Sequence, residues 1–225
     1  MAIAWPSDFP YISAMFARKS LSRSGGFTVT GVEQVVASST DFWVASISFK
    51  IHSREQILAY RGLQAQQWGR AAEWIIPACP KLGLPAGTPE ADYSWSDDWS
   101  TDFSIGPPPG SIPAGYVALV TTLAARGART ITAEFIEGAD LVPVPGMFFS
   151  IGNRLYSIAT VAAVATRRYT ITFAPGLRAG AAVSTALEFS SPRCLMRLTD
   201  DNAGQLDLDM LRFSDQKLNF VEVPG

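Results

Sequence analysis

Charged residues are scarce in this chain of 225 residues. Asp, Glu, Lys and Arg make up 17% of it and apolar residues 48%, whereas the charged share of a typical soluble domain is about 25%. This number of charges is too small to cover the surface of a monomer. We therefore expect part of that surface to be buried against partner subunits. The length allows either one large all-β domain or a core domain that carries a second, smaller one.

A cationic surface is lacking as well, since the net charge is −2. Proteins that bind nucleic acid as their main role usually carry a basic patch, so we expect no specific nucleic-acid binding. No stretch approaches the ~18 uncharged apolar residues that a membrane-spanning helix needs. The first residues, MAIAWPSDFP, contain neither a basic region nor the apolar run of a signal peptide. The sequence therefore predicts a soluble, unexported protein with no membrane span.

Histidine and cysteine, the residues that carry much of enzyme chemistry, are nearly absent. His52 is the only histidine, and Cys79 and Cys194 are the only cysteines. A single histidine leaves one possible base for a nucleophilic pair, and no G-x-S-x-G turn presents a nucleophile. No zinc site of ordinary spacing can be assembled, and both thiols lie in apolar stretches typical of buried, reduced cysteines. We therefore expect no enzyme activity, no cofactor and no metal site.

Two acidic clusters are the remaining candidates for chemistry. The segment DDNAGQLDLD resembles a calcium-binding EF-hand loop, but Gly204 falls one place early relative to a start at Asp200, and no Glu closes the register. We expect a solvated turn there, with weak calcium binding as the alternative. The segment DDWSTD holds Asp97, Asp98 and Asp102. Sugar hydrolysis would need two of these carboxylates to face each other, which the spacing alone does not establish.

Glycine and proline are frequent, at eighteen and fifteen residues, and their even spread favours many short strands and turns over long helices. The alternation of apolar residues from Gly26 to Ile51 predicts a hairpin with its turn at SSTD, residues 38–41. Residues 53–69 change to a helical period and begin with the capping pattern S-x-x-Q, so they predict a helix that ends at Gly69.

Residues 80–115 form a different kind of sequence, rich in Pro, Gly, Ser, Asp and Trp. Long segments of this composition are usually binding loops or intersubunit arms. Four large rings lie in this one, and they are candidates for packing either onto the parent domain or against another subunit: Tyr93, Trp95, Trp99 and Phe103. The stretch GPPPGS at 106–111 lacks the Lys-Ser or Lys-Thr pair of a phosphate-binding loop and predicts a stiff hinge.

From residue 116 onward the alternation of strands returns. Six short runs occur in about 75 residues with no helix between them, so they must pair antiparallel, and a small barrel is the natural product. In PGMFFSIGNRLYSIATV, residues 145–161, Gly152 and Asn153 separate two of these strands in a pattern that suits a type II′ turn. We therefore predict a mainly β protein. An antiparallel β-sandwich core with one short helix (1–115 and 191–225) carries a separable, inserted β-barrel-like domain (116–190).

Three segments carry a resemblance to a known family: PGMFFSIGNRLYSIATV, RYTITFAPGLRAGAAVSTALEF and CLMRL. They are similar to the closing half of the distal tail proteins, minor tail proteins of long-tailed, siphovirus-like bacteriophages. A "PG..F.IG.RLY" hairpin, a "YTI...PGLR" strand and turn, and a terminal "RL" recur in that family. The match is best from Pro145 to Leu198 and weaker over WPSDFP at 5–10 and the final FVEV.

The resemblance implies a structural protein of the virion tail tip, or baseplate, that is assembled in the host cytoplasm. It implies a ring, most simply of six copies, that joins the tail tube protein to the hub and fibre proteins, and it brings no catalytic residues. A rival hypothesis is a carbohydrate- or receptor-binding module that uses Tyr93, Trp95 and Trp99 as a stacking platform. A hydrolase built on Asp97 or Asp98 is the third.

Overall fold

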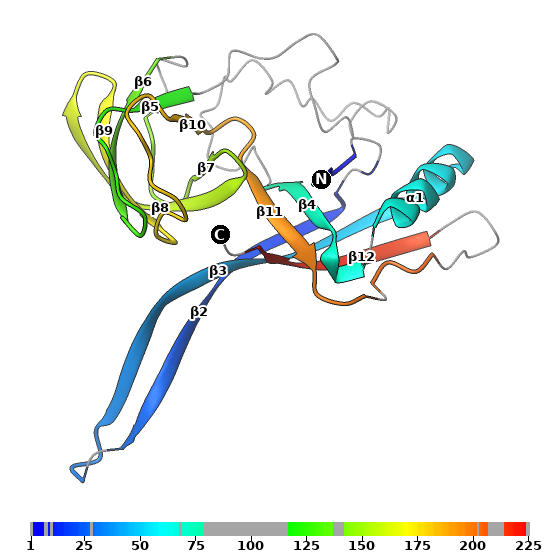
Figure 1. Cartoon of the computed structure of the whole chain (residues 1–225), viewed down its shortest axis with the longest axis horizontal. Coiled ribbons are helices and arrows are strands. Elements are labelled where there is room, and N and C mark those ends of the chain that lie inside the picture. The colour runs from blue at the N-terminus through cyan, green and yellow to red at the C-terminus, as the bar shows by residue number, and fades with distance from the viewer. Residues whose placement is uncertain are drawn as a thin grey trace.

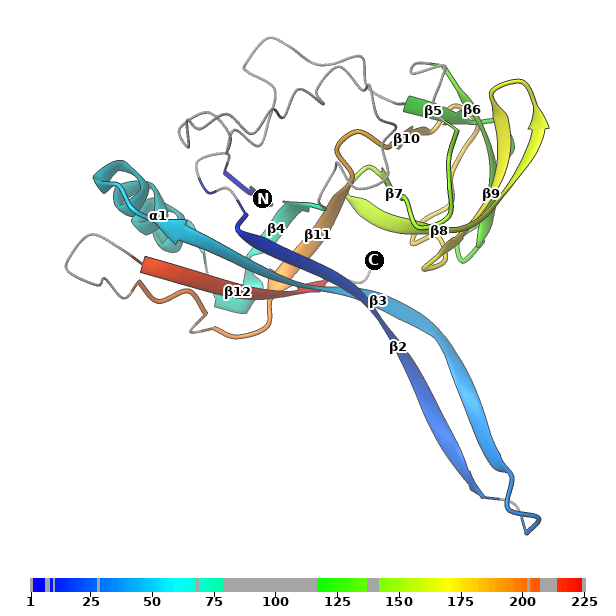
Figure 2. The same ribbon diagram turned by 180° about the vertical axis from the view of Figure 1, so that it is seen from behind.

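The computed structural model describes residues 2–6, 9, 11–27, 29–67, 69–78, 117–136, 142–201, 203–206 and 214–223. These residues form a six-stranded sheet, a closed six-stranded barrel and one α-helix, and a long hairpin extends away from both the sheet and the barrel (Figures 1 and 2). The prediction of a mainly β protein with antiparallel sheets, one helix and a small barrel is confirmed.

The sheet has the strand order β1-β4-β11-β12-β3-β2. β1 pairs with β4 in parallel, and every other neighbouring pair in this sheet is antiparallel. Because β12 lies between β11 and β3, the last strand joins the sheet that the first strands began. The strands are β1 (Ile3–Ala4), β2 (Ser13–Phe27), β3 (Glu33–Ile51), β4 (Glu73–Pro77), β11 (Arg193–Leu198) and β12 (Ser214–Glu222).

One face of this sheet carries the first hydrophobic core. Along β3 every second residue from Asp41 to Ile51 is buried, as expected of a strand whose side chains alternate between two faces. Helix α1 (Arg54–Gln66) packs on this face, and the ring of its buried Tyr60 lies 5.7 Å from that of Phe49. Phe9 and Leu155, the latter from the barrel, belong to the same cluster. The layer over the sheet is therefore built from several separate segments.

Helix α1 begins as the sequence predicts. The Ser53 hydroxyl accepts a hydrogen bond from the backbone N–H of Gln56 (3.1 Å), and the Gln56 side chain accepts one from the N–H of His52 (3.0 Å). Two N–H groups without partners inside the helix are thereby satisfied. The helix ends at Gln66, earlier than predicted, because Gly69 belongs to the short 3₁₀-helix η1 (Gly69–Ala71).

The barrel closes in the order β10-β5-β6-β9-β8-β7, with all neighbours antiparallel. Its strands all lie between β4 and β11 in the chain, and they enclose a second core. Inside that core the ring of Phe149 contacts those of Tyr156 and Phe173 at 5.3 and 5.4 Å. The strands are β5 (Val117–Val120), β6 (Thr130–Phe135), β7 (Phe148–Ile151), β8 (Arg154–Ala165), β9 (Arg168–Ala174) and β10 (Ala186–Glu188).

The β7–β8 hairpin has the two-residue turn for which its sequence is suited. Ile151 pairs with Arg154 across the strands, which leaves Gly152 and Asn153 as the turn. Gly152 has a φ of +58°, a conformation that side chains other than that of glycine rarely adopt. A Cβ added at Gly152 would meet nothing within 4 Å, so glycine is needed there for its backbone and not for lack of space.

The turn predicted at residues 38–41 is wrong. β3 continues as a strand through these residues and pairs with β2. The register shifts there, because Ser20 lies opposite Asp41 and Ser22 opposite Ala37, so three residues of β3 lie against one residue of β2. The chain reverses between Phe27 and Glu33 instead. A run of polar residues such as SSTD suggests a turn if every strand is assumed to pack one face against an apolar core. Here the hairpin is leaving the body of the protein (Figure 2), and Asp41 is buried against charged partners and not against an apolar core, so polar residues are compatible with a strand.

Candidate assembly interface

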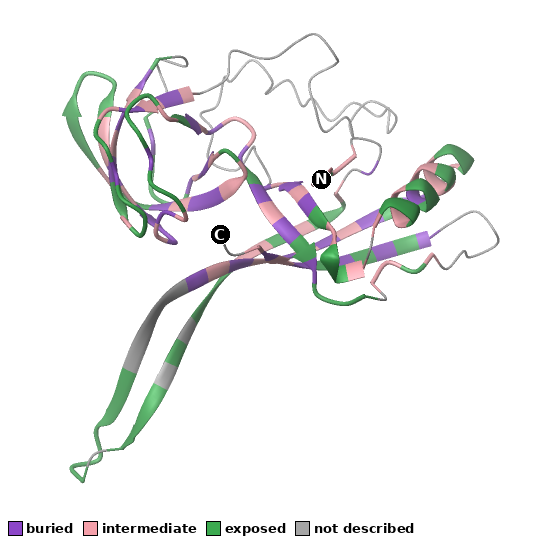
Figure 3. Cartoon of the chain, in the orientation of Figure 1, coloured by how far each residue is buried: buried purple, intermediate pink, exposed green. Residues whose placement is uncertain are grey.

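The outer part of the β2–β3 hairpin, residues 18–40, is here called the arm. Residues 24–27 and 29–35, on both sides of its reversal, are exposed, and Figure 3 shows this end of the hairpin in the colour of exposed residues. Large apolar side chains are among them: Phe27 is 76% exposed, Val29 109% and Val35 58%. A two-stranded hairpin is marginally stable alone, and clustered apolar exposure marks sites of interaction.

The arm also has two open edges. β2 pairs only with β3, and β12 pairs with β3 no farther toward the arm than Val44. Among the strands that the structure describes, none pairs with the outer edge of β2 or with the corresponding edge of β3 beyond Val44. Free edges are templates for strand addition by another chain. Lys19 on β2 is exposed, and charged side chains on edge strands restrict such pairing to suitable partners.

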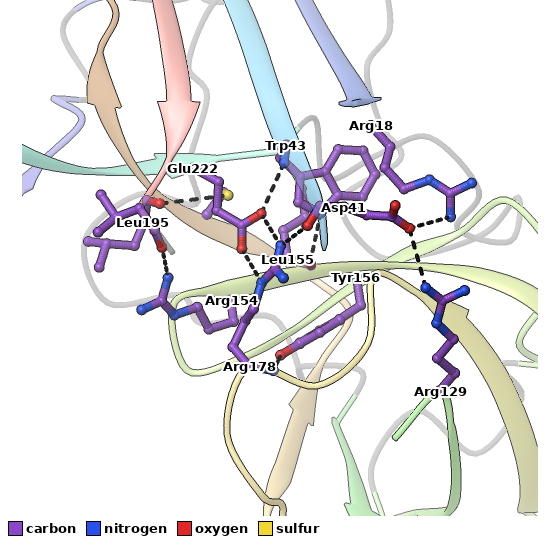
Figure 4. A network of polar contacts seen from close by, with 12 residues as sticks. Arg18, Asp41, Trp43, Arg129, Arg154, Leu155, Tyr156, Arg178, Leu195 and Glu222 are labelled. Atoms are coloured by element: carbon purple, nitrogen blue, oxygen red, sulfur yellow. Dashed lines mark hydrogen bonds and ion pairs between the residues drawn. The ribbon is translucent and has the colours of Figure 1, made fainter. Parts of the chain in front are cut away.

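The root of the arm meets the barrel in a buried polar junction, drawn in Figure 4. At its centre the Glu222 carboxylate, 1% exposed, accepts hydrogen bonds from Arg178 Nε (2.9 Å) and Nη2 (2.8 Å). It also accepts one from the backbone N–H of Trp43 (2.9 Å). Arg178 follows β9 of the barrel, whereas Trp43 and Glu222 lie on strands of the sheet. One carboxylate therefore joins the two halves of the molecule.

Asp41 extends the junction to the arm. Its carboxylate is 7% exposed and lies 4.0 Å from the guanidinium of Arg18 on β2 and 3.7 Å from that of Arg129 in the barrel. The backbone carbonyl of Asp41 accepts a further hydrogen bond from Arg178. Because Asp41 immediately follows the arm in β3, these contacts attach the base of the arm to the barrel.

Further hydrogen bonds and apolar contacts reinforce the junction. The indole N–H of Trp43 donates a hydrogen bond to the carbonyl of Leu155 in β8 (2.8 Å), and the Trp43 ring packs edge-on against Phe148 of β7 at 5.4 Å. Leu155 is fully buried and Phe148 packs against the core of the sheet. Arg154 donates to the backbone carbonyl of Val223 next to Glu222. The barrel and the sheet thus share packed surface.

The electrostatics of the junction favour the protonated form of Arg178. The hydrogen bond to Glu222 raises the pKa of Arg178, which therefore stays protonated at every accessible pH. Burial raises the pKa of the Cys194 thiol and that of Tyr156, and it raises the pKa of Tyr60 to about 12. A thiol held protonated is a poor nucleophile, so these groups suit packing better than reaction.

Most residues singled out by the sequence lie outside the described part of the chain. These are Cys79, the hinge at 106–111, the acids Asp97, Asp98 and Asp102, and the rings Tyr93, Trp95, Trp99 and Phe103. Of the second acidic cluster, Asp201 accepts a hydrogen bond from the N–H of Arg70 (2.8 Å). His52 is exposed just before α1.

Within the described residues, no group of three His, Cys, Asp or Glu side chains could hold a metal ion. Across the same part of the chain, no helix has the length and hydropathy needed to cross a bilayer.

The junction residues were missed by sequence reasoning because their partners are distant: Arg178 and Glu222 are 44 positions apart, and Trp43 and Glu222 are 179 apart. One signal was present. Leu218, Phe220 and Glu222 follow the inward alternation of β12, so the pattern places a carboxylate on a buried face. A buried carboxylate requires a cationic or N–H partner, although the pattern does not say which.

Comparison of the chain with protein-family models gives no match, and comparison with curated proteins gives none either.

Proposed function

We propose that this protein is a structural component of a bacteriophage tail tip, a distal tail protein that forms a ring, most simply a hexamer, joining the tail tube to the hub and fibres. The arm carries this proposal. It exposes Phe27, Val29 and Val35 and has two open strand edges, which a neighbouring subunit would cover. The resemblance to distal tail proteins over residues 145–198 supports it independently, since that region builds part of the barrel and β11.

Ring formation requires a contact between two different surfaces of the subunit, because a cyclic ring of more than two copies is built from head-to-tail contacts. The arm supplies one such surface, reaching outward from the sheet, while the barrel lies beside the sheet at the base of the arm (Figure 1). The arm would therefore contact the next subunit, leaving the barrel to contact other tail proteins. The buried junction at Asp41 and Glu222 would hold the two at a constant angle.

The test is to purify the full chain and measure its mass by light scattering, alone and after mixing with assembled tail tube protein. Negative-stain images should show closed rings with six-fold symmetry in at least one of these preparations. Interfaces of obligate oligomers usually exceed about 2,000 Å², so a ring should persist on dilution. A strict monomer in both preparations, at high concentration, would contradict the proposal.

A second experiment addresses the barrel. Leu123 is 77% exposed and Val183 57%, and the segments that carry them are joined by the Ala124–Ala181 bridge. The double substitution Leu123→Ser and Val183→Ser should reduce binding of hub or fibre proteins while rings still form. Val164→Ser, at a residue 58% exposed on the β8–β9 hairpin, is the matched control. Loss of ring formation in the double variant would assign this surface to the subunit contact instead.

A further inference from the structure

Charge is unevenly divided along this chain. The described residues include sixteen of the eighteen Lys and Arg residues but only ten of the twenty Asp and Glu residues. The described part of the chain therefore carries an excess of positive charge, whereas the whole chain has a net charge of −2. Residues 80–115 have the opposite balance, with one cation, Lys81, against five acids: Glu90, Asp92, Asp97, Asp98 and Asp102.

The arm has the complementary character. Residues 18–40 contain three cations, Arg18, Lys19 and Arg23, and one acid, Glu33. Arg18 is engaged by Asp41 at the root, whereas Lys19 is exposed. Beyond these cations lie the exposed side chains of Phe27 and Val29. The arm thus combines positive charge with exposed apolar surface along one short ribbon.

The segment from residue 88 to 104, TPEADYSWSDDWSTDFS, combines the features that such a surface would bind. It contains the five acids and no cation, and it contains the four rings of Tyr93, Trp95, Trp99 and Phe103. Aromatic side chains are the commonest anchors of protein interfaces. They also attract cations to their faces, while complementary charge speeds and orients association.

We propose that residues 88–104 of one copy bind to the arm of a second copy, with the acids meeting Lys19 and the tryptophans covering Phe27 and Val29. This inference rests on the proposed ring and names its subunit contact. The second copy is the partner because the arm extends away from its own sheet and barrel in both views (Figures 1 and 2). Its exposed end therefore faces neighbouring molecules.

Complementary charge reversal in the full chain tests this directly. One variant carries Lys19→Glu and Arg23→Glu in the arm, and the other carries Asp97→Lys and Asp98→Lys in the segment. Each variant alone should associate about tenfold more weakly than the native chain, because like charges then oppose each other at the contact. An equimolar mixture should regain association, since each reversed arm then meets a reversed segment on the other variant.

The matched control is Arg54→Glu with Arg61→Glu, which makes the same change of charge at two exposed positions of α1 and should leave association unchanged. Light scattering over a dilution series reports the effect for all variants. An effect of the control as large as that of the arm variant would show that net charge, and not this contact, governs association.

Three outcomes would overturn the inference. Unchanged association of both variants would show that the segment and the arm do not meet. Weak association that mixing fails to restore would place the contact within one chain. The absence of self-association in the native chain, both alone and with assembled tail tube protein, would remove the second copy as partner. Rings of unaltered stability from both variants would overturn this contact while leaving the proposed function intact.

Discussion

The two ends of β3 lie in opposite environments. From Asp41 to Ile51 alternate residues are buried, and Trp43 is held by the barrel, by Glu222 and by the core of the sheet. From Glu33 to Val35 the same strand is exposed on successive residues. One continuous strand thus connects a junction with many hydrogen bonds and ion pairs to the arm, whose described residues near the reversal are exposed.

This difference in burial separates two roles of β3, one in folding and one in association. At the junction, burial makes each polar group depend on a specific partner, because an uncompensated buried charge is costly. In the arm, residues 24–27 and 29–35 are exposed, so their sequence is little constrained by the stability of the monomer. Substitutions at the junction should therefore act on folding, and substitutions in the arm should act on association.

The largest expected effect is that of Glu222→Ala. Arg178 would lose its buried counter-charge and the N–H of Trp43 its acceptor, so the free energy of unfolding should fall by about 3–5 kcal/mol. Urea denaturation followed by tryptophan fluorescence measures this. Glu134→Ala, which breaks an exposed pair with Arg168, is the control and should lower it by about 0–1 kcal/mol.

Replacing both charged partners sharpens this prediction. Arg178→Met with Glu222→Met should recover much of the stability lost by Glu222→Ala, because no unpaired charge then remains buried. If Glu222→Ala were no more destabilising than Glu134→Ala, the junction would differ little from the exposed surface and the comparison would fail.

Alkaline pH should weaken the core and not the arm. Burial raises the pKa of Tyr60 from 10.0 to about 12, so the folded state retains the phenol proton at pH values where the unfolded state releases it. The contribution of Tyr60 to stability is therefore constant below about pH 10 and is lost as the pH rises from 10 to 12, a loss of up to about 3 kcal/mol. The raised pKa of Cys194 acts in the same direction.

Unfolding measured from pH 8 to 12 should show this decline, and Tyr60→Phe should reduce its slope. The arm, residues 18–40, contains neither Tyr nor Cys. Hydrogen exchange in the arm should therefore show no corresponding loss of protection, apart from the intrinsic effect of pH on exchange. An unchanged slope in Tyr60→Phe would show that other groups cause the decline.

A smaller effect is expected at the turn of the β7–β8 hairpin. Gly152→Ala should lower the free energy of unfolding by about 1 kcal/mol, because alanine resists the φ of +58° although space is available. Gly62→Ala is the control, since Gly62 lies inside α1 with open space and no positive φ. It should raise stability by about 0.5–1 kcal/mol, and a loss of equal size at both positions would contradict this account.

The smallest effect on folding is expected in the arm. Phe27→Ser with Val29→Ser should change the free energy of unfolding by less than about 0.5 kcal/mol, because both side chains are already exposed. Self-association should weaken about tenfold if a second copy covers them. Leu58→Ser, at a residue 55% exposed on α1, should alter neither quantity. Melting curves and light scattering distinguish the two effects, and a large loss of stability would show that the arm is part of the core.

The barrel could be predicted well because apolar residues recur along its short strands and several of its turns carry glycine. Phe149 and Ile158 point into one enclosed core, and Gly152 adopts the positive φ that its turn needs. The arm could not be predicted in the same way. The alternation from Gly26 to Ile51 indicated strands, but the polar SSTD residues indicated a turn where β3 in fact continues.

Local sequence determined the elements that depend on near neighbours: the capped start of α1, the two-residue turn at Gly152 and the antiparallel pairing of short strands in the barrel. Backbone conformation and the alternation of side chains act over a few residues, so they can be read directly from the chain. Only the tertiary structure decided which charge meets Glu222, because Arg178 and Trp43 reach it across 44 and 179 positions. Tertiary structure also decided that half of a continuous strand leaves the protein, since burial depends on what the rest of the chain places over it.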